Sequence, residues 1–349
     1  MVRFAILATG GIAAAFARCA RHAAGAEVSA VVSRTQAAAD AFAAEHGIAH
    51  ASTDLSATLA RPDVDALYVA TPHPMHAAAV RTALDTRVPV LCEKPLTMTA
   101  AEARELAALA RERQTFLMEA MWTRFVPALR EAKRLVETGR IGPVRRLCAE
   151  FAIDRPFDAA HRLFAPELGG GALHDLGVYP IHLALMFMGR PAKVHATWTA
   201  APTGVDTSAD LRCEWPDGRL AYLTCGFDRA GANIAVIEGE QGSIVLDATF
   251  IGAQRLWVVP NRLAPLWGFG KPGGAAAAFR RLARRAPLPG VSRVDLPYPD
   301  DGLQFEIEAA ANAIRDGLVE HPLAPLADTV AALEIIEDAL AQPATWPGT

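Results

Sequence analysis

Side chains suited to acid–base chemistry occur in two short motifs of this 349-residue sequence. In the first, Lys94 follows Glu93 directly after an apolar run. In the second, Asp175 precedes Tyr179 by four residues in a segment with helical spacing, so the carboxylate and the phenol are expected on one helix face. A phenol exchanges protons near neutral pH only if its pKa falls below the ordinary value of about 10, and a nearby ammonium favours that change. Together, Lys94, Asp175 and Tyr179 could serve hydride transfer between an alcohol and a carbonyl, which needs a proton donor or acceptor on the oxygen.

A glycine-containing turn lies close to the N-terminus, where the sequence reads Ala-Thr-Gly-Gly-Ile-Ala from Ala8 onward. In the dinucleotide fingerprint G-x-G-x-x-G/A, the second glycine lets the backbone approach a pyrophosphate and the last residue allows close helix–strand packing. Gly10 and Ala13 occupy these two positions, and Gly10, Gly11 and Ile12 are the candidate phosphate-binding residues. Ala8 replaces the tight-turn glycine, which we expect to be tolerated only with a negative φ. An ordinary strand-to-helix turn is the alternative, but the position after the first strand favours a dinucleotide site.

The end of the second expected strand bears on the choice of dinucleotide. It reads Val32-Ser33-Arg34-Thr35, without the acidic residue that binds the ribose hydroxyls of NAD. A hydroxyl at Ser33 and a guanidinium at Arg34 suit the additional 2′-phosphate of NADP. The sequence therefore predicts NADP as the cofactor and NAD as the less favoured one, the alternative being that Arg34 is an ordinary surface arginine.

The first 120 residues alternate strand and helix patterns, which predicts an α/β Rossmann domain with a doubly wound parallel sheet. The expected strands are 2–8, 27–32, 66–70, 88–92 and 115–118. The expected helices are 10–21, 36–46, 54–59, 75–84 and 100–113.

Beyond about residue 124 the pattern changes to consecutive strands, which predicts an α+β domain with a largely antiparallel sheet. The expected strands are 144–153, 193–199, 209–215, 220–227, 234–238 and 243–246. The expected helices are 126–138, 172–188, 304–316 and 327–341, and residues 260–299, rich in Pro and Gly, are expected to be irregular. We therefore expect an NADP-binding domain over 1–122 and a substrate-binding and dimerisation domain over 123–349.

Several motifs in the expected order resemble those of the Gfo/Idh/MocA oxidoreductases. They are Thr71-Pro72-His73-Pro74 with His76, Glu93-Lys94-Pro95, the stretch from Phe116 to Phe125, the Gly169 to Pro180 segment, Thr203-Gly204-Val205-Asp206, Glu238-Gly239 to Gly242, and Gly302 to Glu306. The resemblance covers nearly the whole chain. Its most specific part, Glu-Ala-Met-Trp-Thr-Arg-Phe, is similar to the branch that holds dimeric dihydrodiol dehydrogenases and NADP-dependent D-xylose 1-dehydrogenases.

The resemblance implies roles for individual residues. Tyr179 would be the acid/base, at a position where other members use histidine, and Lys94 would be aimed at the nicotinamide by a Lys94–Pro95 peptide that is often cis in the family. Further cofactor-binding candidates are Thr71, Pro72, His73, His76 and Glu93. Substrate-binding candidates are Trp122, Arg124, Phe125, Arg162 and Tyr179, with His161 and Phe164 ranked below them. Trp122 and Phe125 could instead be packing residues, and His182, three residues after Tyr179, is expected to be a packed core histidine.

Composition excludes several other classes of protein. The chain is 52% hydrophobic and 21% charged with a net charge of −4, which favours neither nucleic acid nor a membrane surface as a partner. An arginine-rich run over 280–285 is expected to be a solvated face. An N-terminal signal peptide is disfavoured because Gly10 and Gly11 interrupt the apolar stretch. Five cysteines without metal-type spacing indicate reduced thiols of a cytoplasmic protein and neither a disulfide framework nor a zinc site.

The sequence-based prediction is thus an NADP-dependent oxidoreductase acting on a sugar, polyol or trans-dihydrodiol, as a homodimer formed through the second sheet. The alternatives are a family enzyme acting on an inositol, sugar nucleotide or imine, and a catalytically idle NADP-sensing regulatory protein. The presence of Lys94, Asp175 and Tyr179 disfavours the sensor, because NADP sensing does not require all three.

Overall fold

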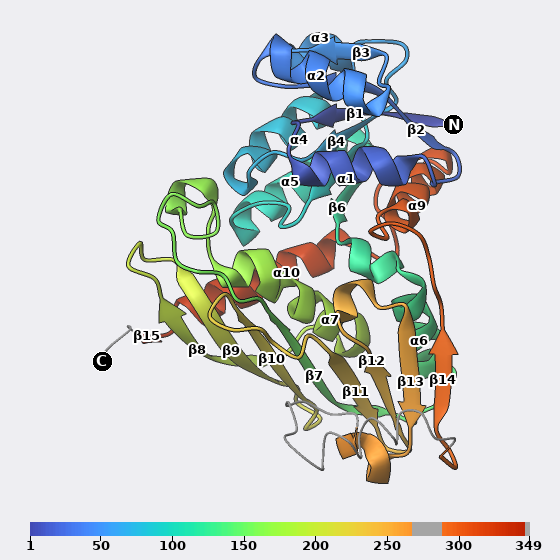
Figure 1. Ribbon diagram of the computed structural model, residues 1–349, viewed down its shortest axis with the longest axis vertical. Helices are drawn as coiled ribbons and strands as arrows, with labels where there is room; N and C mark the ends of the chain where they lie inside the picture. The colour runs from blue at the N-terminus through green and yellow to red at the C-terminus, as the bar shows by residue number, and fades with distance from the viewer. Residues whose placement is uncertain (267–287, 346–349) are drawn as a thin grey trace. The chain divides into compact units, whose positions relative to one another are not determined.

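A computed structural model describes residues 1–266 and 288–345 of the chain. The chain forms two compact units, each with its own sheet (Figure 1). Unit 1 comprises Met1–Phe125, Glu167–Gly169 and Pro299–Glu334. Unit 2 comprises Val126–Pro166, Gly170–Tyr298 and Ile335–Thr349. The first unit therefore contains a segment from the C-terminal part of the chain as well as residues 1–125.

Unit 1 is built on a six-stranded, entirely parallel sheet of order β3-β2-β1-β4-β5-β6. The strands are β1 (Val2–Leu7), β2 (Ala26–Val32), β3 (His50–Ser52), β4 (Ala66–Val69), β5 (Val90–Glu93) and β6 (Leu117–Ala120). The helices between them are α1 (Gly11–Ala20), α2 (Gln36–His46), α3 (Leu55–Leu59), α4 (His76–Asp85) and α5 (Ala100–Arg113). The order is that of a doubly wound dinucleotide-binding fold, so the fold predicted for this part of the chain is confirmed.

Alternate residues of the central strands enter two different cores, because successive side chains of a strand point to opposite faces. Phe4 and Tyr68 belong to the cluster that includes α1 and α9 (Gln304–Arg315), whereas Leu67 belongs to the cluster formed with α4 and α5. Phe16 of α1 stacks on Tyr68 with 3.7 Å between ring centroids. Truncating a buried aromatic side chain of this kind costs about 3–5 kcal/mol. Burial on both faces explains why β4 and the part of β1 from Phe4 onward are continuously apolar rather than alternating.

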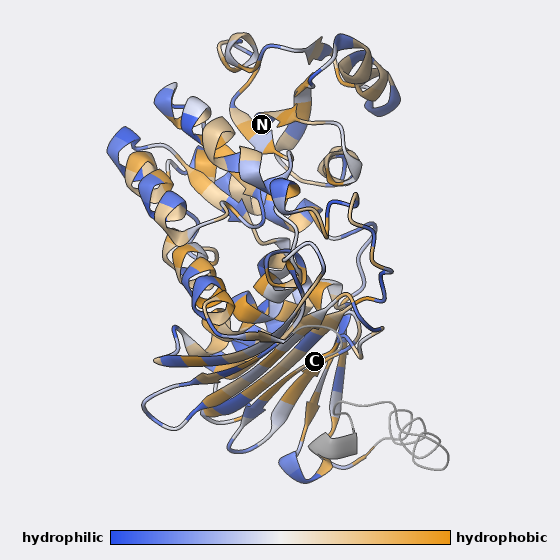
Figure 2. Ribbon diagram, turned by 90° about the vertical axis from the view of Figure 1, so that its left-hand side faces the viewer, coloured by the Kyte–Doolittle hydropathy of each residue, from blue (hydrophilic) through white to orange (hydrophobic). Residues whose placement is uncertain are grey.

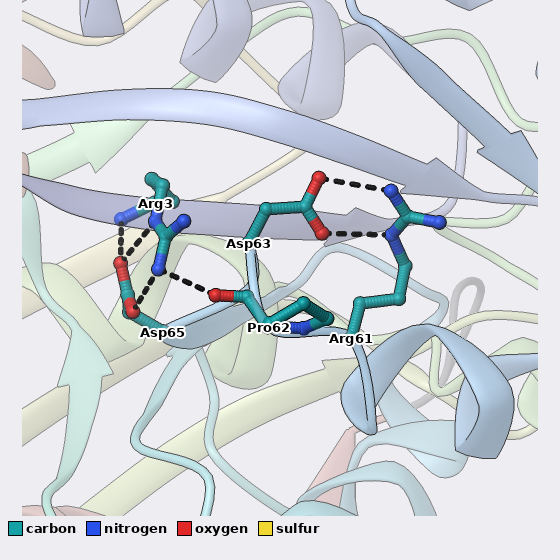
Figure 3. A network of polar contacts seen from close by, with 5 residues as sticks. All are labelled: Arg3, Arg61, Pro62, Asp63 and Asp65. Carbon is teal, nitrogen blue, oxygen red and sulfur yellow. Dashed lines mark hydrogen bonds and ion pairs between the residues drawn. The ribbon is translucent and has the colours of Figure 1, made fainter.

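Polar contacts tie the start of β1 to the segment that leads into β4 (Figure 3). The Asp65 carboxylate accepts hydrogen bonds from the backbone amide of Arg3 at 2.9 Å and from its guanidinium at 2.8 Å. The same guanidinium donates to the Pro62 carbonyl at 2.7 Å. The hydrogen bond from Arg3 lowers the pKa of Asp65. These bonds join the two central strands, β1 and β4, at their amino-terminal ends.

Unit 2 is built on a nine-stranded sheet of order β14-β13-β12-β11-β7-β10-β9-β8-β15. The strands are β7 (Val144–Ala152), β8 (Lys193–Ala200), β9 (Asp206–Glu214), β10 (Leu220–Gly226), β11 (Ala235–Gly239), β12 (Ser243–Leu246), β13 (Arg255–Val259), β14 (Ser292–Asp295) and β15 (Ala344–Thr345). Only the β7–β10 and β8–β15 pairs are parallel, so the largely antiparallel sheet is confirmed.

One face of this sheet is covered by helices, as its residue pattern requires. Helices α6 (Pro127–Glu137) and α7 (Val178–Met188) pack against it. Exposed residues alternate with half-buried ones along β8, and buried residues alternate with more accessible ones along β10. Figure 2 shows hydrophilic and hydrophobic colours alternating along strands of this sheet. Such alternation is typical of a sheet with one packed and one open face.

The segment expected to be irregular, residues 260–299, contains strand β14 and the short helix Asn261–Leu266. The expectation was therefore wrong for the strand, which pairs with β13 through Arg255 and Asp295 among others. In this four-residue strand only Val294 is apolar, too short a pattern to indicate a strand. The remainder of the segment, residues 267–287 with the arginine-rich run 280–285, lies outside the described residues.

The chain closes with α9 and α10 (Leu326–Leu340), close to the two helices predicted there. Helix α9 packs against α1, β1 and β2 and so belongs to the Rossmann-type unit. Within the part of the chain that the structure describes, none of the helices is long and apolar enough to cross a membrane. All five cysteines are free thiols, as predicted.

Candidate active site

The turn after β1 has the backbone course of a dinucleotide-binding turn. Ala8 lies at φ 104°, a conformation that glycine adopts far more easily than alanine. The expectation that alanine requires a negative φ here was therefore wrong. The amide of Ala8 donates to the Val32 carbonyl at 2.9 Å, and this bond holds the residue in its unfavourable conformation at the end of the strand. Such local strain is typical of functional turns.

The N-terminus of α1 is open to a ligand. Gly10 occupies its N-cap position in an extended conformation, with no side-chain cap among the described residues. A Cβ built at Gly10 or Gly11 would meet no described atom within 4 Å, so packing within the protein does not explain why glycine stands there. Uncapped amides and the positive end of the helix dipole attract phosphate. Ile12, the third residue predicted to bind the pyrophosphate, is 37% exposed beside this turn.

Ser33 and Arg34 lie next to this turn, because β2 neighbours β1 in the sheet. The hydroxyl oxygens of Ser33 and Thr9 are 3.5 Å apart. Arg34 is exposed, and Thr35 caps α2 by accepting a hydrogen bond from the Ala38 amide at 3.3 Å. Because Thr35 begins the next helix, the hydroxyl and the guanidinium before it stand at the carboxyl end of β2, where the ribose of a dinucleotide is bound.

The residues after β4 lie at the same edge of the sheet. The Thr71 hydroxyl oxygen is buried and has no hydrogen-bond partner among the described residues. Pro72 is exposed, and His73 contacts the Gly169 carbonyl through Nδ1 at 3.2 Å. Gly169 lies at φ +74°, and a Cβ there would come within 3.0 Å of His73 Cβ. An unsatisfied buried hydroxyl is costly unless a ligand or water completes it, which fits Thr71 as a cofactor contact.

Two buried side chains hold the turn that carries Lys94. The Lys94–Pro95 peptide is cis, as the family resemblance implied. The ring of His76 is completely buried and contacts the carbonyls of Pro95 at 2.9 Å and Thr71 at 2.8 Å. The carboxylate of Glu119, in β6, accepts from the Leu96 amide at 3.0 Å. His76 thus lies between the carbonyls of Pro95 and Thr71, with one ring nitrogen facing each.

Sequence reasoning missed the role of Glu119. This residue lies within the Glu-Ala-Met-Trp-Thr-Arg-Phe stretch, but its neighbours in sequence do not indicate its partners. Its second carboxylate oxygen accepts from the Thr329 hydroxyl at 2.8 Å, so Glu119 links the Lys94 turn to α10. The only available signal was an acidic residue inside an apolar strand, where a charge needs hydrogen-bond partners.

Glu93 is turned into the protein, towards a second buried acid. Its carboxylate accepts hydrogen bonds from the Tyr68 hydroxyl and, at 3.3 Å, from the Lys94 amide. Glu306 of α9 is completely buried, and neither of its carboxyl oxygens has a hydrogen-bond partner among the described residues. Burial, followed by the charge of Glu93, raises the pKa of Glu306 well above its ordinary value. Two neighbouring buried carboxyls cannot both ionise cheaply, so Glu306 is the member of the pair that keeps its proton.

Two of the predicted substrate-binding residues make contacts inside unit 1. Arg124 is 2% exposed, and its guanidinium donates to the Asp328 carboxylate at 2.7 Å and to the Leu323 carbonyl at 2.9 Å. Phe125 is also 2% exposed and meets His321 edge-on at 5.0 Å between ring centroids. Both side chains thus make buried contacts within unit 1, whereas Trp122 of the same stretch is half-buried.

Asp175 and Tyr179 lie on one continuous helical segment of unit 2, as predicted. A π-helical turn, Leu173–Gly177, leads directly into α7. The Asp175 carboxylate forms an ion pair of 3.1 Å with Arg162. Tyr179 is 7% exposed and packs edge-on against Phe151, with 5.5 Å between centroids. Single π-turns occur frequently at functional sites.

The same helical segment contains His182, the histidine that follows Tyr179 by three residues. His182 is only 2% exposed, which matches the expected core position. Arg162, by contrast, is 57% exposed, so its guanidinium is accessible to a ligand while it holds Asp175.

Two family models match the chain in succession. The model for the NAD-binding Rossmann fold of an oxidoreductase family matches residues 2–121, and the model for the Gfo/Idh/MocA C-terminal domain matches residues 129–245. The chain belongs to the Gfo/Idh/MocA oxidoreductase family. The resemblance inferred from the sequence motifs is thereby confirmed.

Relatives within this family match most of the chain. A trans-1,2-dihydrobenzene-1,2-diol dehydrogenase from Mus musculus is 32% identical over 318 residues, which span 90% of this chain and 87% of the relative. The dehydrogenase of the same name from Oryctolagus cuniculus is 31% identical, and the match covers 89% of each chain.

Solved structures of the same fold include enzymes in complex with nicotinamide cofactors. A 3-ketoreductase from Actinomadura kijaniata, solved with NADP and TDP-benzene, has a TM-score of 0.79 at 26% identity and covers 99% of both chains. Levoglucosan dehydrogenase, solved with NADH and levoglucosan, has a TM-score of 0.80 at 20% identity, covering 97% of this chain and 96% of its own. At 20% identity, the similarity to levoglucosan dehydrogenase shows only that the two proteins share a fold.

Proposed function

We propose that this Gfo/Idh/MocA oxidoreductase uses NADP to transfer a hydride to or from a CH–OH/C=O group of a sugar, polyol or trans-dihydrodiol. The observation that carries the proposal is the intact set of Lys94, Asp175 and Tyr179 in a chain with an open phosphate turn. Lys94 follows β5 at the carboxyl edge of the parallel sheet, the edge at which such sheets bind ligands. Asp175 and Tyr179 share one helical segment, where Tyr179 packs on an aromatic ring.

The cofactor residues in this proposal surround the carboxyl ends of β1, β2 and β4. Gly10, Gly11 and Ile12 bind the pyrophosphate at the start of α1. Ser33 and Arg34 bind the 2′-phosphate, because a hydroxyl and a guanidinium match a phosphate dianion and no acid stands there to repel it. The residues toward the nicotinamide are Thr71, Pro72, His73, His76, Glu93 and Lys94. The NADP complex of the Actinomadura kijaniata 3-ketoreductase supports this choice of cofactor.

When bound, the nicotinamide accepts or supplies the hydride. Tyr179 takes the proton from the substrate hydroxyl during oxidation and returns one during reduction. The Lys94 ammonium favours the phenolate form of Tyr179 by charge attraction and donates a hydrogen bond to the reacting oxygen. Asp175, held by Arg162 at 3.1 Å, orients the substrate and the phenol from the preceding helical turn.

The relatives support a hydroxylated ring as the substrate. Dihydrodiol dehydrogenases are about one-third identical to this chain, and a structurally similar 3-ketoreductase was solved with NADP and TDP-benzene. Aromatic side chains beside hydrogen-bond donors suit both a sugar ring and an aromatic diol. We assign Trp122, Arg162 and Tyr179 to this ring.

Replacing Tyr179 by Phe tests the proposal. The Y179F variant should lower kcat by about 100- to 10,000-fold, the range expected for a lost general acid/base, on the best compound of a panel of aldoses, polyols and trans-dihydrodiols. Its dissociation constant for NADPH, measured by fluorescence titration, should stay unchanged. Y298F is the matched control, because Tyr298 donates to the Gly252 carbonyl at 2.8 Å and is assigned neither to the site nor to the dimer contact. Near-normal turnover of Y179F would refute the assignment.

Lys94 gives an independent readout. For carbonyl reduction, the K94M variant should move the basic limb of the kcat/KM profile to higher pH, because without the neighbouring cation Tyr179 keeps its proton to higher pH. K133M, on α6 where Lys133 pairs with Glu137 at 2.8 Å, is the control. NADP binding by the wild type without turnover of any compound would support the sensor alternative.

We further propose that the protein is a cytoplasmic homodimer. The free state of all five cysteines agrees with a reducing compartment. The solvent-accessible faces of β8 and β10, which include Lys193 and Tyr222, would form the contact. Sedimentation equilibrium should give twice the 37.1 kDa chain mass, and a monomer at micromolar concentration would contradict the proposal.

A further inference from the structure

A buried carboxylate from a distant strand meets the start of the helical segment that carries Asp175 and Tyr179. Asp206, the first residue of β9, is 2% exposed. Its Oδ2 accepts a hydrogen bond of 2.6 Å from the amide of Leu173, the first residue of the π-helical turn. The amide of Ala172 also stabilises this carboxylate. The preceding residue, Ala172, has no side chain that could cap the segment, so Asp206 performs the capping from another part of the chain.

Gly171 provides the space that this carboxylate occupies. It lies at φ +127°, and a Cβ built on it would stand 2.4 Å from Asp206 Oδ1. A side chain at Gly171 would therefore push the carboxylate out of its position. The amide of Gly171 donates to the Leu163 carbonyl at 3.0 Å, so the same glycine also fixes the segment that contains Arg162.

A second contact fixes the helical segment near its Gly177 end. A Cβ at Gly177, the last residue of the π-turn, would come within 3.0 Å of Cys225 Sγ on β10. The segment is thus fixed at its start by Asp206 and at its end by close packing on β10. Since Asp175 lies between the two points and Tyr179 follows the second, the rotation of the segment about its axis sets the direction of both side chains.

We propose that Asp206 is a positioning residue for catalysis, which holds the helical segment in the orientation at which Asp175 and Tyr179 act, with Gly171 as its required neighbour. The inference rests on the proposed function of Tyr179. A negative charge at a helix N-terminus is stabilised by the helix dipole and by the free amides there. Burial raises the pKa of Asp206 to about 6, so the carboxylate is largely ionised at neutral pH. The titratable group facing it is the Cys225 thiol, whose own pKa is raised well above its ordinary value by burial first and by Asp206 next.

The test compares D206A and D206N with the same changes at Asp210, which lies on the same strand and accepts a hydrogen bond from Thr224 at 2.7 Å near the surface. Concentrations of active enzyme are set by NADPH titration. D206A should lower kcat by about 10- to 100-fold, the cost of a displacement of about 1 Å, while KM and the NADPH dissociation constant change less than about twofold. D206N should lose less, because its amide oxygen still accepts from Leu173. The Asp210 variants should match the wild type.

A double-mutant cycle guards against a purely structural effect. G171A should lower kcat strongly in the wild-type background and less in the D206A background, because removing the carboxylate removes one of its clashes. If D206A does not fold, D206N and G171A decide the matter by the same readouts. Wild-type kcat in D206N and D206A, or equal losses at Asp210, would overturn the inference. If Y179F itself turns over normally, the proposed function fails; if Y179F is inactive and the Asp206 variants are unimpaired, only the present inference fails.

Discussion

The ionisation of Asp206 predicts how the stability of the protein depends on pH. Burial raises the pKa of this carboxyl from an ordinary value of 3.8 to about 6 in the folded protein. In the unfolded chain the group ionises at its ordinary pKa, so between these two values the folded state binds more protons. Stability from this group is therefore fully present below pH 3.8 and is lost as the pH rises to about 6.

The size of the effect follows from the same two values. One pKa unit corresponds to about 1.4 kcal/mol, so the free energy of unfolding should fall by about 3 kcal/mol between the acidic and neutral ends of this interval. Asp206 is 2% exposed, so screening by solvent reduces this figure little. D206N cannot titrate and should lack this contribution altogether.

The assay is urea unfolding of the wild type and D206N between pH 4 and pH 7.5, followed by circular dichroism. The difference in unfolding free energy, wild type minus D206N, should decrease as the pH rises, which cancels the titration of all other groups. D210N serves as the control, since Asp210 lies nearer the surface of the same strand. A difference that is constant over this range, or that grows with pH, would refute the argument that burial controls this carboxyl.

Three further predictions concern unit 1. The stability of E306Q relative to the wild type should increase as the pH rises above 4.5, because burial raises the pKa of Glu306 and the wild type loses stability with rising pH. Urea unfolding at pH 5 and pH 8 measures this, and a larger relative stability of E306Q at pH 5 than at pH 8 would contradict it. A8G should raise the free energy of unfolding by about 1 kcal/mol, because glycine relieves the φ of 104° at Ala8; thermal and urea unfolding measure it, and a loss of stability would count against strain at this turn. R34D should raise the KM for NADP by about 10- to 100-fold and leave that for NAD unchanged or lower, because a charge-assisted hydrogen bond contributes about 1.5–3 kcal/mol; equal effects on both cofactors would exclude 2′-phosphate recognition.

The type and order of most elements could be predicted from the sequence. Apolar runs and amphipathic stretches predicted the five longest strands of the parallel sheet and the helices between them, because strands buried on both faces consist mostly of apolar residues. The three-residue β3, the five-residue β13 and the short strands β14 and β15 were not predicted. Their pairing comes from long-range neighbours such as Arg255 beside Asp295, and a few residues carry too little periodicity to indicate a strand.

The candidate site was predicted unevenly. Motifs singled out Lys94, Asp175, Tyr179 and the glycines of the phosphate turn, whose proposed roles follow from their own chemical groups and stay predictions. The placement of Arg124 at a substrate surface stays a prediction, although the structure shows its guanidinium paired with Asp328 inside unit 1. The sequence near a motif does not reveal whether a basic or aromatic residue faces a ligand or the protein core.

By itself, the sequence determined the fold class, the family and the chemical groups available for proton transfer, because each depends on residue type and local spacing. Only the tertiary structure decided which side chains support those groups. Glu119 reaches the Lys94 turn, and Asp206 reaches the amide of Leu173, across long stretches of chain. A buried polar atom needs a hydrogen-bond partner. That partner can come from any part of the fold, so the neighbouring residues in the sequence do not identify it.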